Sequence, residues 1–453
     1  MHASLFAASA LAMAALLPAA AEAKVTAAEA AKLGKELTPM GAIRAGNADG
    51  SIPAWEGGIT RPPANHKPGT TEIDPFPDDK PRFTIAPDNV GQHAARLSEG
   101  HVAMFKRYPQ TWRMPVYQTR RTSSFPKRID DAAIANATTA ELLPTGSGVK
   151  NARESVPFPI PQNGLEAIWN HLLRYRGETI QQVYAQGVPT AGGDYTLVKI
   201  EERIVFPYAM PGATTENTGN RLIYFLQTVT EPARLAGEIL LVHEPIDQDV
   251  ETRKAWTYNP GLRRVRRAPN VAYDNPGTAS DGQRTNDQNG MFNGNTDRYD
   301  WELKGRREMY VPYNSYKLHS DKVKYSDILK PGHFNPELLR YELHRVWVVE
   351  AKVKAGTSHI YARRTFYIDE DSWSILHIDN YDARGEIWRV QESHPINFYN
   401  IPMLTETAMA IYDLQNGRYL SFGLNNEEQP TVYNAPMSVD DFTPDTMRSA
   451  GRR

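Results

Sequence analysis

From about Tyr195 almost to the end of the chain, apolar and polar residues alternate with a period of two. Val198, Ile200 and Ile204 fall on one side of an extended segment, and charged residues lie between them. This alternation is typical of an antiparallel strand with one buried face. The same pattern predicts further strands over residues 221–230, 237–246, 253–258, 262–268, 299–311, 340–354, 359–369, 373–381, 385–394 and 405–421.

Short polar turns separate these runs, as in Asn259-Pro260-Gly261 and in the Asp-Ala-Arg-Gly sequence of 382–385. Both contain residues that tight reversals favour. Successive strands are therefore expected to lie side by side in a meander, without the helical crossovers of parallel sheets. Because about ten strands in one sheet must curl strongly or close, the pattern predicts a mainly β (α+β) fold with a strongly curved antiparallel sheet.

Three segments have helical spacing instead: 26–37, 91–108 and 164–175. The first begins with a capping box, in which Thr26 caps the helix and the Glu29 side chain reaches back to it. The third places its large apolar residues on one face. Each of these helices is expected to cover an apolar surface of the sheet.

Residues 38–88 are rich in Pro and Gly. Such residues weaken regular elements, so we expect an extended arm that lies over another surface, with Trp55 as its anchor. The chain is accordingly divided into N-terminal helices and arm over 24–160, packing on a main β domain over 161–453.

The N-terminal residues 1–23 have the features of a cleavable signal peptide. Residues 5–17 are apolar but too few to span a bilayer as a helix, and Ala21-Glu22-Ala23 fits the A-x-A cleavage rule. The first residues lack Lys and Arg, so either the true start lies upstream or the signal is atypical. The mature chain is expected to be soluble and to work in the periplasm of a Gram-negative cell.

Charge and cysteine content exclude several classes of function. The chain has 51 Lys and Arg residues against 53 Asp and Glu residues, a formal net charge of -2. This balance gives no excess of positive charge with which to bind nucleic acid. The absence of cysteine removes disulfides, thiol catalysis and Cys-ligated zinc.

A long polar stretch, 274–297, interrupts the strands. Residues 287–290 fit part of an EF-hand register, but Thr285 and Thr296 occupy positions where acidic ligands should stand. A calcium site is therefore not expected. The stretch is interpreted as a solvated loop or as a lid, because loops of this length are usually functional or mobile.

Sequence signatures of catalysis are missing. The twelve histidines form no H-E-x-x-H motif, and the chain has no G-x-S-x-G elbow and no Walker or dinucleotide fingerprint. We therefore predict no cofactor, no metal and no catalytic residue. One alternative stays open, since two carboxylates suffice for a β-rich glycoside hydrolase. The candidates, which a solvated strand face would also explain, are Glu201, Glu202, Asp369, Glu370, Asp371, Asp379 and Asp382.

Four arginines, Arg263, Arg264, Arg266 and Arg267, follow the first of these turns. Such a hairpin could bind a carboxylate, a phosphate or an acidic partner. Charge that protects an exposed edge strand explains the cluster equally well.

Large aromatic residues recur on the predicted strands, among them Trp256, Trp301, Trp347 and Phe366. Most aromatic side chains of this kind form core. Together they would also suit a concave groove for an acyl chain or another apolar ligand. We expect these four to line such a groove, with Trp169 on a covering helix and 274–297 as a gate.

Segment 253–267 resembles a strand-turn-strand of periplasmic lipoprotein-sorting proteins, in which a W-x-Y-x-P strand precedes a basic return strand. Residues 363–369, followed by 381–385, resemble other hairpins of those proteins. The arm segment 46–58, together with 277–283 and 291–294, is similar to a large periplasmic branch of the LolA/LolB-like superfamily whose function is unassigned. The likeness covers nearly the whole mature chain.

The resemblance implies an unclosed half-barrel whose apolar concave face is covered by helices and receives acyl chains in the lipoprotein sorters. It also implies partners, because genes of this branch lie beside resistance-nodulation-division type inner-membrane transporters and outer-membrane proteins. The expected function is a periplasmic, non-enzymatic carrier or adaptor for a lipid or other hydrophobic molecule. The alternative is the hydrolase, acting on envelope glycans. This chain is about twice as long as a lipoprotein-sorting carrier, so its own residues could fill the groove.

Overall fold

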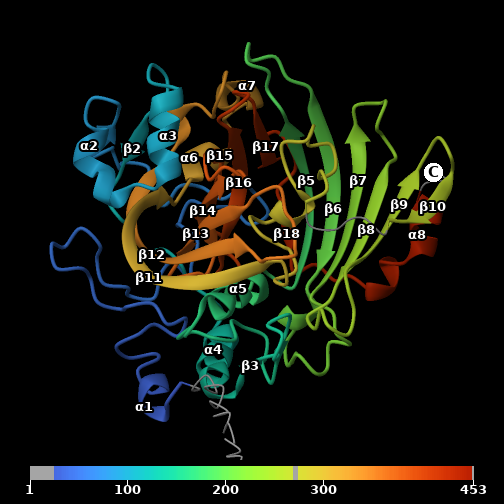
Figure 1. Cartoon of the computed structure of the whole chain (residues 1–453), viewed down its shortest axis with the longest axis horizontal. Helices are drawn as coiled ribbons and strands as arrows, with labels where there is room; N and C mark the ends of the chain where they lie inside the picture. Colours follow the sequence, from blue (N-terminus) through green and yellow to red (C-terminus); the bar gives the residue numbers. More distant parts are fainter. Residues whose placement is uncertain (1–24, 269–273, 451–453) are drawn as a thin grey trace, which may run out of the picture.

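The computed structural model describes residues 25–268 and 274–450, and within them one sheet of 16 strands dominates (Figure 1). The predicted signal peptide lies outside the described residues. Beside the large sheet stands a small pair, β3 (Glu141–Leu142) and β4 (Val149–Lys150). The expected mainly β fold is confirmed.

Two meanders make up most of the sheet, and within each every strand is antiparallel to the next. The first meander contains β5 (Thr179–Gly187), β6 (Leu197–Val205), β7 (Ile223–Glu231), β8 (Ile239–Glu244), β9 (Lys254–Asn259) and β10 (Arg264–Arg267). The second contains β11 (Tyr299–Pro312), β12 (Tyr341–Val353), β13 (Arg363–Asp369), β14 (Ile375–Tyr381), β15 (Ile387–Asn397), β16 (Leu404–Asp413) and β17 (Tyr419–Leu424).

Strand β5 joins the meanders, because it pairs with β6 on one side and with β17 on the other. The short β18 (Val432–Tyr433) continues the β17 side of β5. The end strands of the two meanders, β10 and β11, do not pair with each other. The sheet is therefore curved and unclosed, as expected for a half-barrel.

Helices are few and cover different parts of the sheet. The described helices are α1 (Ala27–Ala30), α2 (Val90–His93), α3 (Glu99–Arg107), α4 (Lys127–Thr139), α5 (Gly164–Leu173), α6 (Tyr316–His319), α7 (Tyr325–Ile328) and α8 (Pro444–Ala450), with 3-10 turns at Ala94–Arg96, Pro207–Ala209, Asn286–Gln288, Pro336–Leu338 and Val439–Asp441. Helix α5 packs on β11 and β12. We call its side of the sheet the inner face and the opposite side the outer face.

The segment before residue 160 packs on the second meander. Helix α3 contacts β14 and β15 on the outer face, and β1 (Phe83–Ile85) and β2 (Met114–Val116) extend the sheet. Val116 forms a parallel bridge to Tyr341 at the start of β12, so the sheet is mixed at this point. Arg121 pairs with Asp371 at 2.6 Å, with both side chains buried. The domain boundary near residue 160 stays a prediction.

The arm lies along this surface. Trp55 donates from its indole nitrogen to the Ser123 carbonyl at 2.9 Å. Closer to the start of the arm, the indole of the buried Trp373 donates to the Met40 carbonyl at 2.9 Å. The first part of the arm is thus held by one of its backbone carbonyls and by the Trp55 side chain.

Several predicted elements differ from the structure. The helix predicted over 26–37 ends at Ala30, and the one over 91–108 is interrupted because Leu97 is extended and Ser98 caps a new helix. The run 405–421 is two strands, since the chain reverses at Gly417, whose φ of 73° suits glycine. Helix α4 and strand β5 were not predicted.

Candidate ligand-binding cavity

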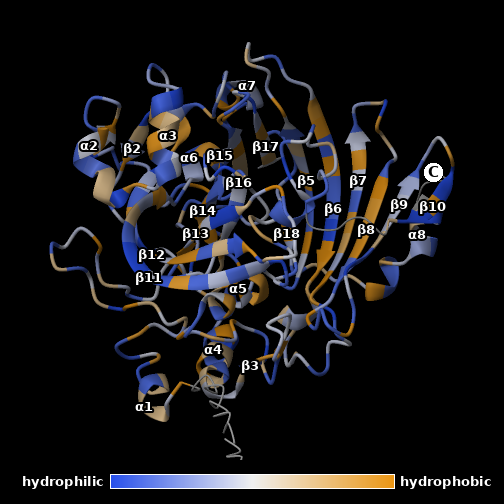
Figure 2. Ribbon diagram, in the orientation of Figure 1, coloured by the Kyte–Doolittle hydropathy of each residue, from blue (hydrophilic) through white to orange (hydrophobic). Residues whose placement is uncertain are grey.

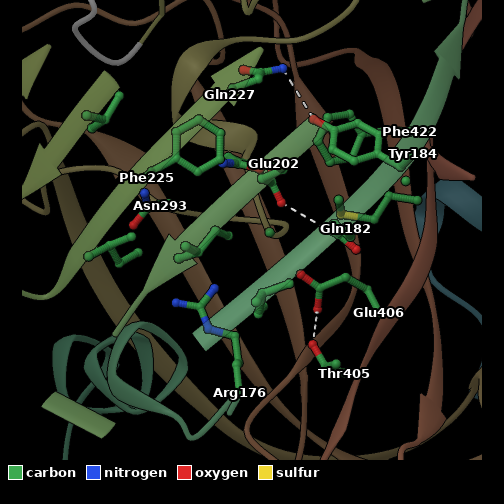
Figure 3. Close-up of a pocket in the computed structure, with 18 of the residues that line it drawn as sticks. Arg176, Gln182, Tyr184, Glu202, Phe225, Gln227, Asn293, Thr405, Glu406 and Phe422 are labelled. Atoms are coloured by element: carbon green, nitrogen blue, oxygen red, sulfur yellow. Dashed lines mark hydrogen bonds between the residues drawn. The ribbon is translucent and has the colours of Figure 1, made fainter. Parts of the chain in front are cut away.

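A cavity lies against the inner face of the first meander, between β5–β8 and the segment 274–297 that crosses over them, and the adjoining strands β16 and β17 also line it (Figure 3). We call it the β5–β8 cavity, and 274–297 the crossing segment. About 130 Å³ of it is accessible to the centres of water-sized molecules. By that measure it holds on the order of ten waters.

The cavity floor consists of cross-strand rows. Ile180, Ile204, Phe225 and Val242 are successive register partners on β5 to β8, and they form an apolar row. Figure 2 shows the corresponding apolar bands along these strands. Because alternate residues of a strand share a face, this row presents a continuous apolar surface to the cavity.

A more polar row lies beside it. Gln182, Glu202 and Gln227 are register partners on β5, β6 and β7, and all line the cavity. Gln182 donates to Glu202 at 2.7 Å, and Gln227 donates to the Tyr184 hydroxyl at 3.3 Å. Burial raises the pKa of Glu202 to about 7. The Glu202 carboxyl is therefore partly protonated near neutral pH.

Two further carboxylates line the cavity, and each has a cationic partner. Glu244 accepts from Arg253 at 2.6 Å. Glu406 pairs with Arg174 at 3.3 Å and accepts from the Thr405 hydroxyl at 2.8 Å. Burial opposes ionisation of Glu406, but nearby arginines hold its pKa below the usual value.

The crossing segment forms the roof of the cavity; of the two predicted forms, a solvated loop or a lid, it is not the solvated loop. Much of it is buried against the inner face. On β5, the Gln186 side chain donates to the carbonyls of Thr278 and Ala279 at 3.0 and 2.7 Å. On β15, Gln391 accepts from Gln288 at 2.8 Å. Polar residues are used here to satisfy buried polar groups of the sheet.

Asp287 anchors this roof to the second meander. Its two carboxylate oxygens accept from Arg364 at 2.7 and 3.1 Å, and His359 lies 3.2 Å away. Although burial opposes ionisation, these two partners lower the pKa of Asp287. The residue that fitted the EF-hand register is thus engaged in an internal ion pair.

The predicted groove residues lie elsewhere. Trp301, Trp347 and Phe366 are on the inner face of β11 to β13, and Trp169 of α5 is fully buried among the same cluster of apolar residues. Trp301 and Phe366 both pack edgewise against Phe292 of the crossing segment, at 5.5 Å between ring centres. These side chains fill their own half of the sheet as core.

Trp256 is on the outer face. It is the register partner of Leu241, whereas the neighbouring Val242 faces the cavity. It packs against His243 and the apolar cluster under α8. None of the five aromatic residues therefore lines the β5–β8 cavity, and their role in ligand binding stays a prediction.

The four hairpin arginines are exposed around β10, at one edge of the sheet. Arg263 has a φ of 50° at the turn before this strand. The structure thus presents these guanidiniums to solvent on an edge strand. Their role in binding an anion or a partner stays a prediction.

Of the seven candidate carboxylates, Glu202 lines the cavity. Glu201 is exposed on the other face of β6. Glu370 and Asp371 pair with arginines of β12 and of the N-terminal segment. The remaining candidates also have partners: Asp369 bonds Tyr313 and Ser372, Asp379 bonds His377, and Asp382 pairs with Arg384.

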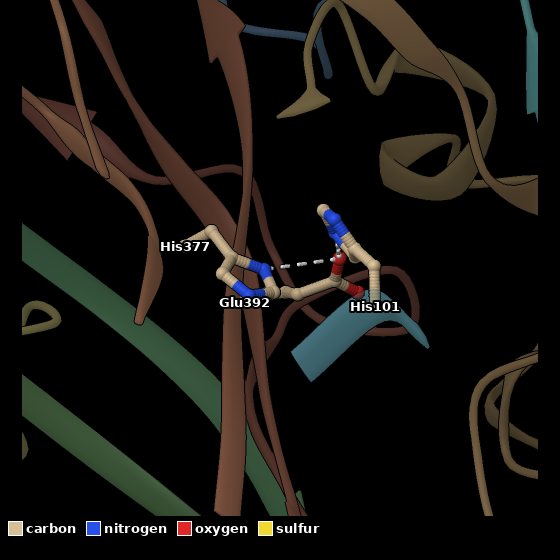
Figure 4. A group of neighbouring side chains, drawn as sticks. All are labelled: His101, His377 and Glu392. Atoms are coloured by element: carbon tan, nitrogen blue, oxygen red, sulfur yellow. Dashed lines mark hydrogen bonds and ion pairs between the residues drawn. The ribbon is translucent and has the colours of Figure 1, made fainter. Parts of the chain in front are cut away.

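A second buried polar group joins α3 to the sheet (Figure 4). His101 and Glu392 are 3.1 Å apart, and His377 lies 2.7 Å from Asp379. The Ser98 amide donates to Nδ1 of His101, so the proton of a neutral His101 is on Nε2, which donates to Glu392. If Nε2 of a neutral His101 bound a metal, the proton would be on Nδ1, where it would face the Ser98 amide, which is also a donor. These bonds favour a structural hydrogen-bond network.

Sequence spacing did not reveal this group, because its members come from α3, β14 and β15. Burial alone would lower the pKa of His377, but Asp379 and Glu392 raise it to about 9. His377 is thus held as a cation between two carboxylates, and the network ties an N-terminal helix to the second meander.

Comparisons with known proteins give a family. Residues 84–448 match the model of a family described as "Protein of unknown function (DUF1329)". The uncharacterized protein PA3922 of Pseudomonas aeruginosa is 50% identical over 432 residues, which cover 95% of each chain.

Two solved structures are similar at low identity. A DUF1329 family protein from Desulfovibrio piger has 16% identity and a TM-score of 0.42, over 60% of this chain and 92% of that chain. LolA superfamily protein NE2245 from Nitrosomonas europaea has 14% identity and a TM-score of 0.35, over 61% of this chain and 94% of that chain.

Proposed function

We propose that the chain, which belongs to the family described as "Protein of unknown function (DUF1329)", is a non-enzymatic carrier or adaptor for a hydrophobic small molecule or lipid. The observation that supports it best is the β5–β8 cavity. Its floor is an apolar row that includes Ile204, Phe225 and Val242, and its roof is a segment of the chain itself. Concave apolar sites with a few polar groups are where proteins bind such ligands.

The proposal includes a place and partners. The carrier works in the periplasm, between an inner-membrane resistance-nodulation-division type transporter and an outer-membrane protein. The exposed arginines of the β9–β10 hairpin contact an acidic surface on one of them. Among residues 25–268 and 274–450, no helix combines the length and apolar character needed to cross a membrane.

Native mass spectrometry of protein purified from the periplasm without detergent tests the proposal, together with lipid extraction. We expect a reproducible bound mass that disappears on denaturation. Val242→Phe, which adds volume on the cavity floor, should reduce the bound fraction severalfold.

The matched control is Leu226→Phe on β7. Leu226 is the register partner of Leu241 on the outer face, so the same added bulk lies away from the cavity. This variant should keep the bound mass. A clean apo mass for the wild-type protein, or equal loss in both variants, would contradict a carrier that uses this cavity.

One observation favours the hydrolase as a second candidate. Glu202 and Glu406 line the same cavity, and their environments move their pKa values in opposite directions. Glycoside hydrolysis uses one carboxyl with a raised pKa as the acid and one with a lowered pKa as the base or nucleophile. Release of sugars from envelope glycans by the wild-type protein, lost in a folded Glu202→Gln variant, would establish this activity in place of the carrier.

A further inference from the structure

Two arginines enter the β5–β8 cavity from different segments. Arg176 lies between α5 and β5, and Figure 3 shows its side chain pointing into the cavity. Arg284 comes from the crossing segment, where Gly277 makes room for it: a Cβ at Gly277 would stand 2.7 Å from the Arg284 guanidinium carbon. The floor and the roof therefore each supply a cation.

Neither guanidinium has the partner that a buried cation normally has. Within the described ranges, neither makes a hydrogen bond or an ion pair, and the Nε atoms of both are buried without a partner. Each is in contact with an aromatic ring, Arg176 with Phe206 at 4.8 Å and Arg284 with Phe422 at 5.0 Å. Burial of an unpaired charge is costly, and desolvation, with Arg174 nearby, lowers the pKa of Arg176 to about 9.

The cavity carboxylates attract these two cations, but none of them is bonded to either guanidinium. Glu244 is bonded to Arg253, and Glu406 to Arg174. Glu202 is bonded to Gln182 and is partly protonated near pH 7. Near neutral pH the free space thus has two cations without a bonded anion, next to an apolar row.

We propose that the ligand is an anionic amphiphile, whose carboxylate or phosphate head is bound by Arg176 and Arg284 while its apolar tail lies on the row of Ile204, Phe225 and Val242. This inference rests on the proposed function and specifies its ligand class. Guanidiniums are suited to such heads because they donate two parallel hydrogen bonds to one anion. A ligand head would supply the bonds that the folded chain leaves unmade.

Calorimetric titration of the delipidated full chain with three probes of equal chain length tests the head group: dodecanoate, dodecyl phosphate and dodecan-1-ol. Hydrogen bonds between charged groups contribute more binding free energy than those to a neutral hydroxyl. We therefore expect the two anions to bind roughly tenfold or more tightly than the alcohol. Arg176→Met and Arg284→Met should each remove most of this preference. Arg284→Lys, which keeps the charge, should restore part of it.

Arg234→Met is the control, because Arg234 is exposed and outside the cavity. It should keep the wild-type preference. Equal affinities for all three probes would overturn the anionic head and leave the carrier proposal standing. Inorganic phosphate that competes as well as dodecyl phosphate would overturn the amphiphile in favour of a small-anion site. No binding of any probe, together with an apo native mass, would overturn both proposals.

Discussion

The two meanders of the sheet use their inner faces in different ways. On β11 to β13, Trp301, Trp347 and Phe366 fill the concavity, and α5 and Phe292 pack on top of them. On β5 to β8, the inner face carries mostly aliphatic and polar side chains, with Tyr184 and Phe225 as its aromatic residues, and a cavity remains. Large aromatic side chains fill the hollow of a curved sheet, so the ligand site is expected where they are fewer.

The outer faces differ as well. The N-terminal segment covers the second meander, with α3 on β14 and β15. The first meander has α8 against β8 to β10 and ends in an exposed arginine hairpin (Figure 1). We call β11 to β13 the filled half and β5 to β8 the hollow half. The filled half is covered on both faces, and the hollow half has a cavity on its inner face and a charged edge beyond it.

The largest expected effect is on the free energy of unfolding, compared between a Phe→Ala substitution in the filled half and one in the hollow half. Phe366→Ala, in the filled half, should lower the free energy of unfolding by about 3–5 kcal/mol, because Phe366 is fully buried. Phe225→Ala, in the hollow half, should cost roughly 2 kcal/mol, since its ring faces a cavity and loses fewer contacts. Urea unfolding measures both values.

The two variants should affect ligand affinity in the reverse order to stability. Dodecanoate binding should weaken severalfold in Phe225→Ala and stay near the wild-type value in Phe366→Ala. If Phe366→Ala instead abolished binding without loss of stability, the aromatic residues of the second meander would form the ligand site.

The next effect concerns stability without ligand. Arg176→Met should raise the unfolding free energy of the delipidated protein by on the order of 1 kcal/mol, because it removes an unpaired buried cation. Arg364→Met should lower it, because Asp287 would lose a bonded partner. A loss of stability in Arg176→Met of the same size would mean that its charge is already compensated in the folded chain.

A smaller effect is a pH dependence of anion binding. The charged groups around Glu202 are Arg176, Arg284 and Glu406, with the Tyr184 hydroxyl also close. As pH falls from 8 to 6 through the pKa of about 7, Glu202 gains a proton and stops competing for the arginines. Dodecanoate should bind roughly threefold more tightly at pH 6 than at pH 8.

Calorimetry at the two pH values, with Glu202→Gln as the control, checks this dependence. The variant should show nearly the same affinity at both pH values. The free energy of unfolding depends on pH as well: the raised pKa of Glu202 stabilises the fold fully below about pH 4.5, the usual value of a Glu carboxyl, and this contribution is lost as pH rises through about 7.

The smallest expected effect is at the hairpin. Arg264→Ser combined with Arg266→Ser should leave the unfolding midpoint and dodecanoate affinity unchanged, because both side chains are exposed at the edge of the sheet. Binding to an acidic envelope partner should weaken and lose its salt dependence. A large loss of stability would show that the arginines protect the edge strand instead.

The same comparison explains what the sequence could and could not predict. Period-two alternation located most strands, because a half-buried strand needs it. Strand β5 was missed because its inner face carries Gln182 and its C-terminal part has small residues, such as Ala185 and Gly187. This is the strand that joins the meanders and borders the cavity.

The sequence did not reveal the β5–β8 cavity for a related reason. Aromatic residues are the strongest apolar signal in the sequence, but here they form core. The polar composition of the crossing segment left a solvated loop and a lid as alternatives, whereas in the structure Gln288 and Asp287 bond Gln391 and Arg364 from distant strands. Such pairs depend on the tertiary fold, and local composition does not reveal them.

Photo-crosslinking tests most directly whether the hollow half is the ligand site. The full chain would be loaded with a dodecanoate that carries a diazirine in its tail, irradiated and mapped by peptide mass spectrometry. We predict labels on β6 to β8 and on the crossing segment, at residues near Phe225 and Val242. Labels concentrated on β11 to β13, around Trp301, Trp347 and Phe366, would contradict the account.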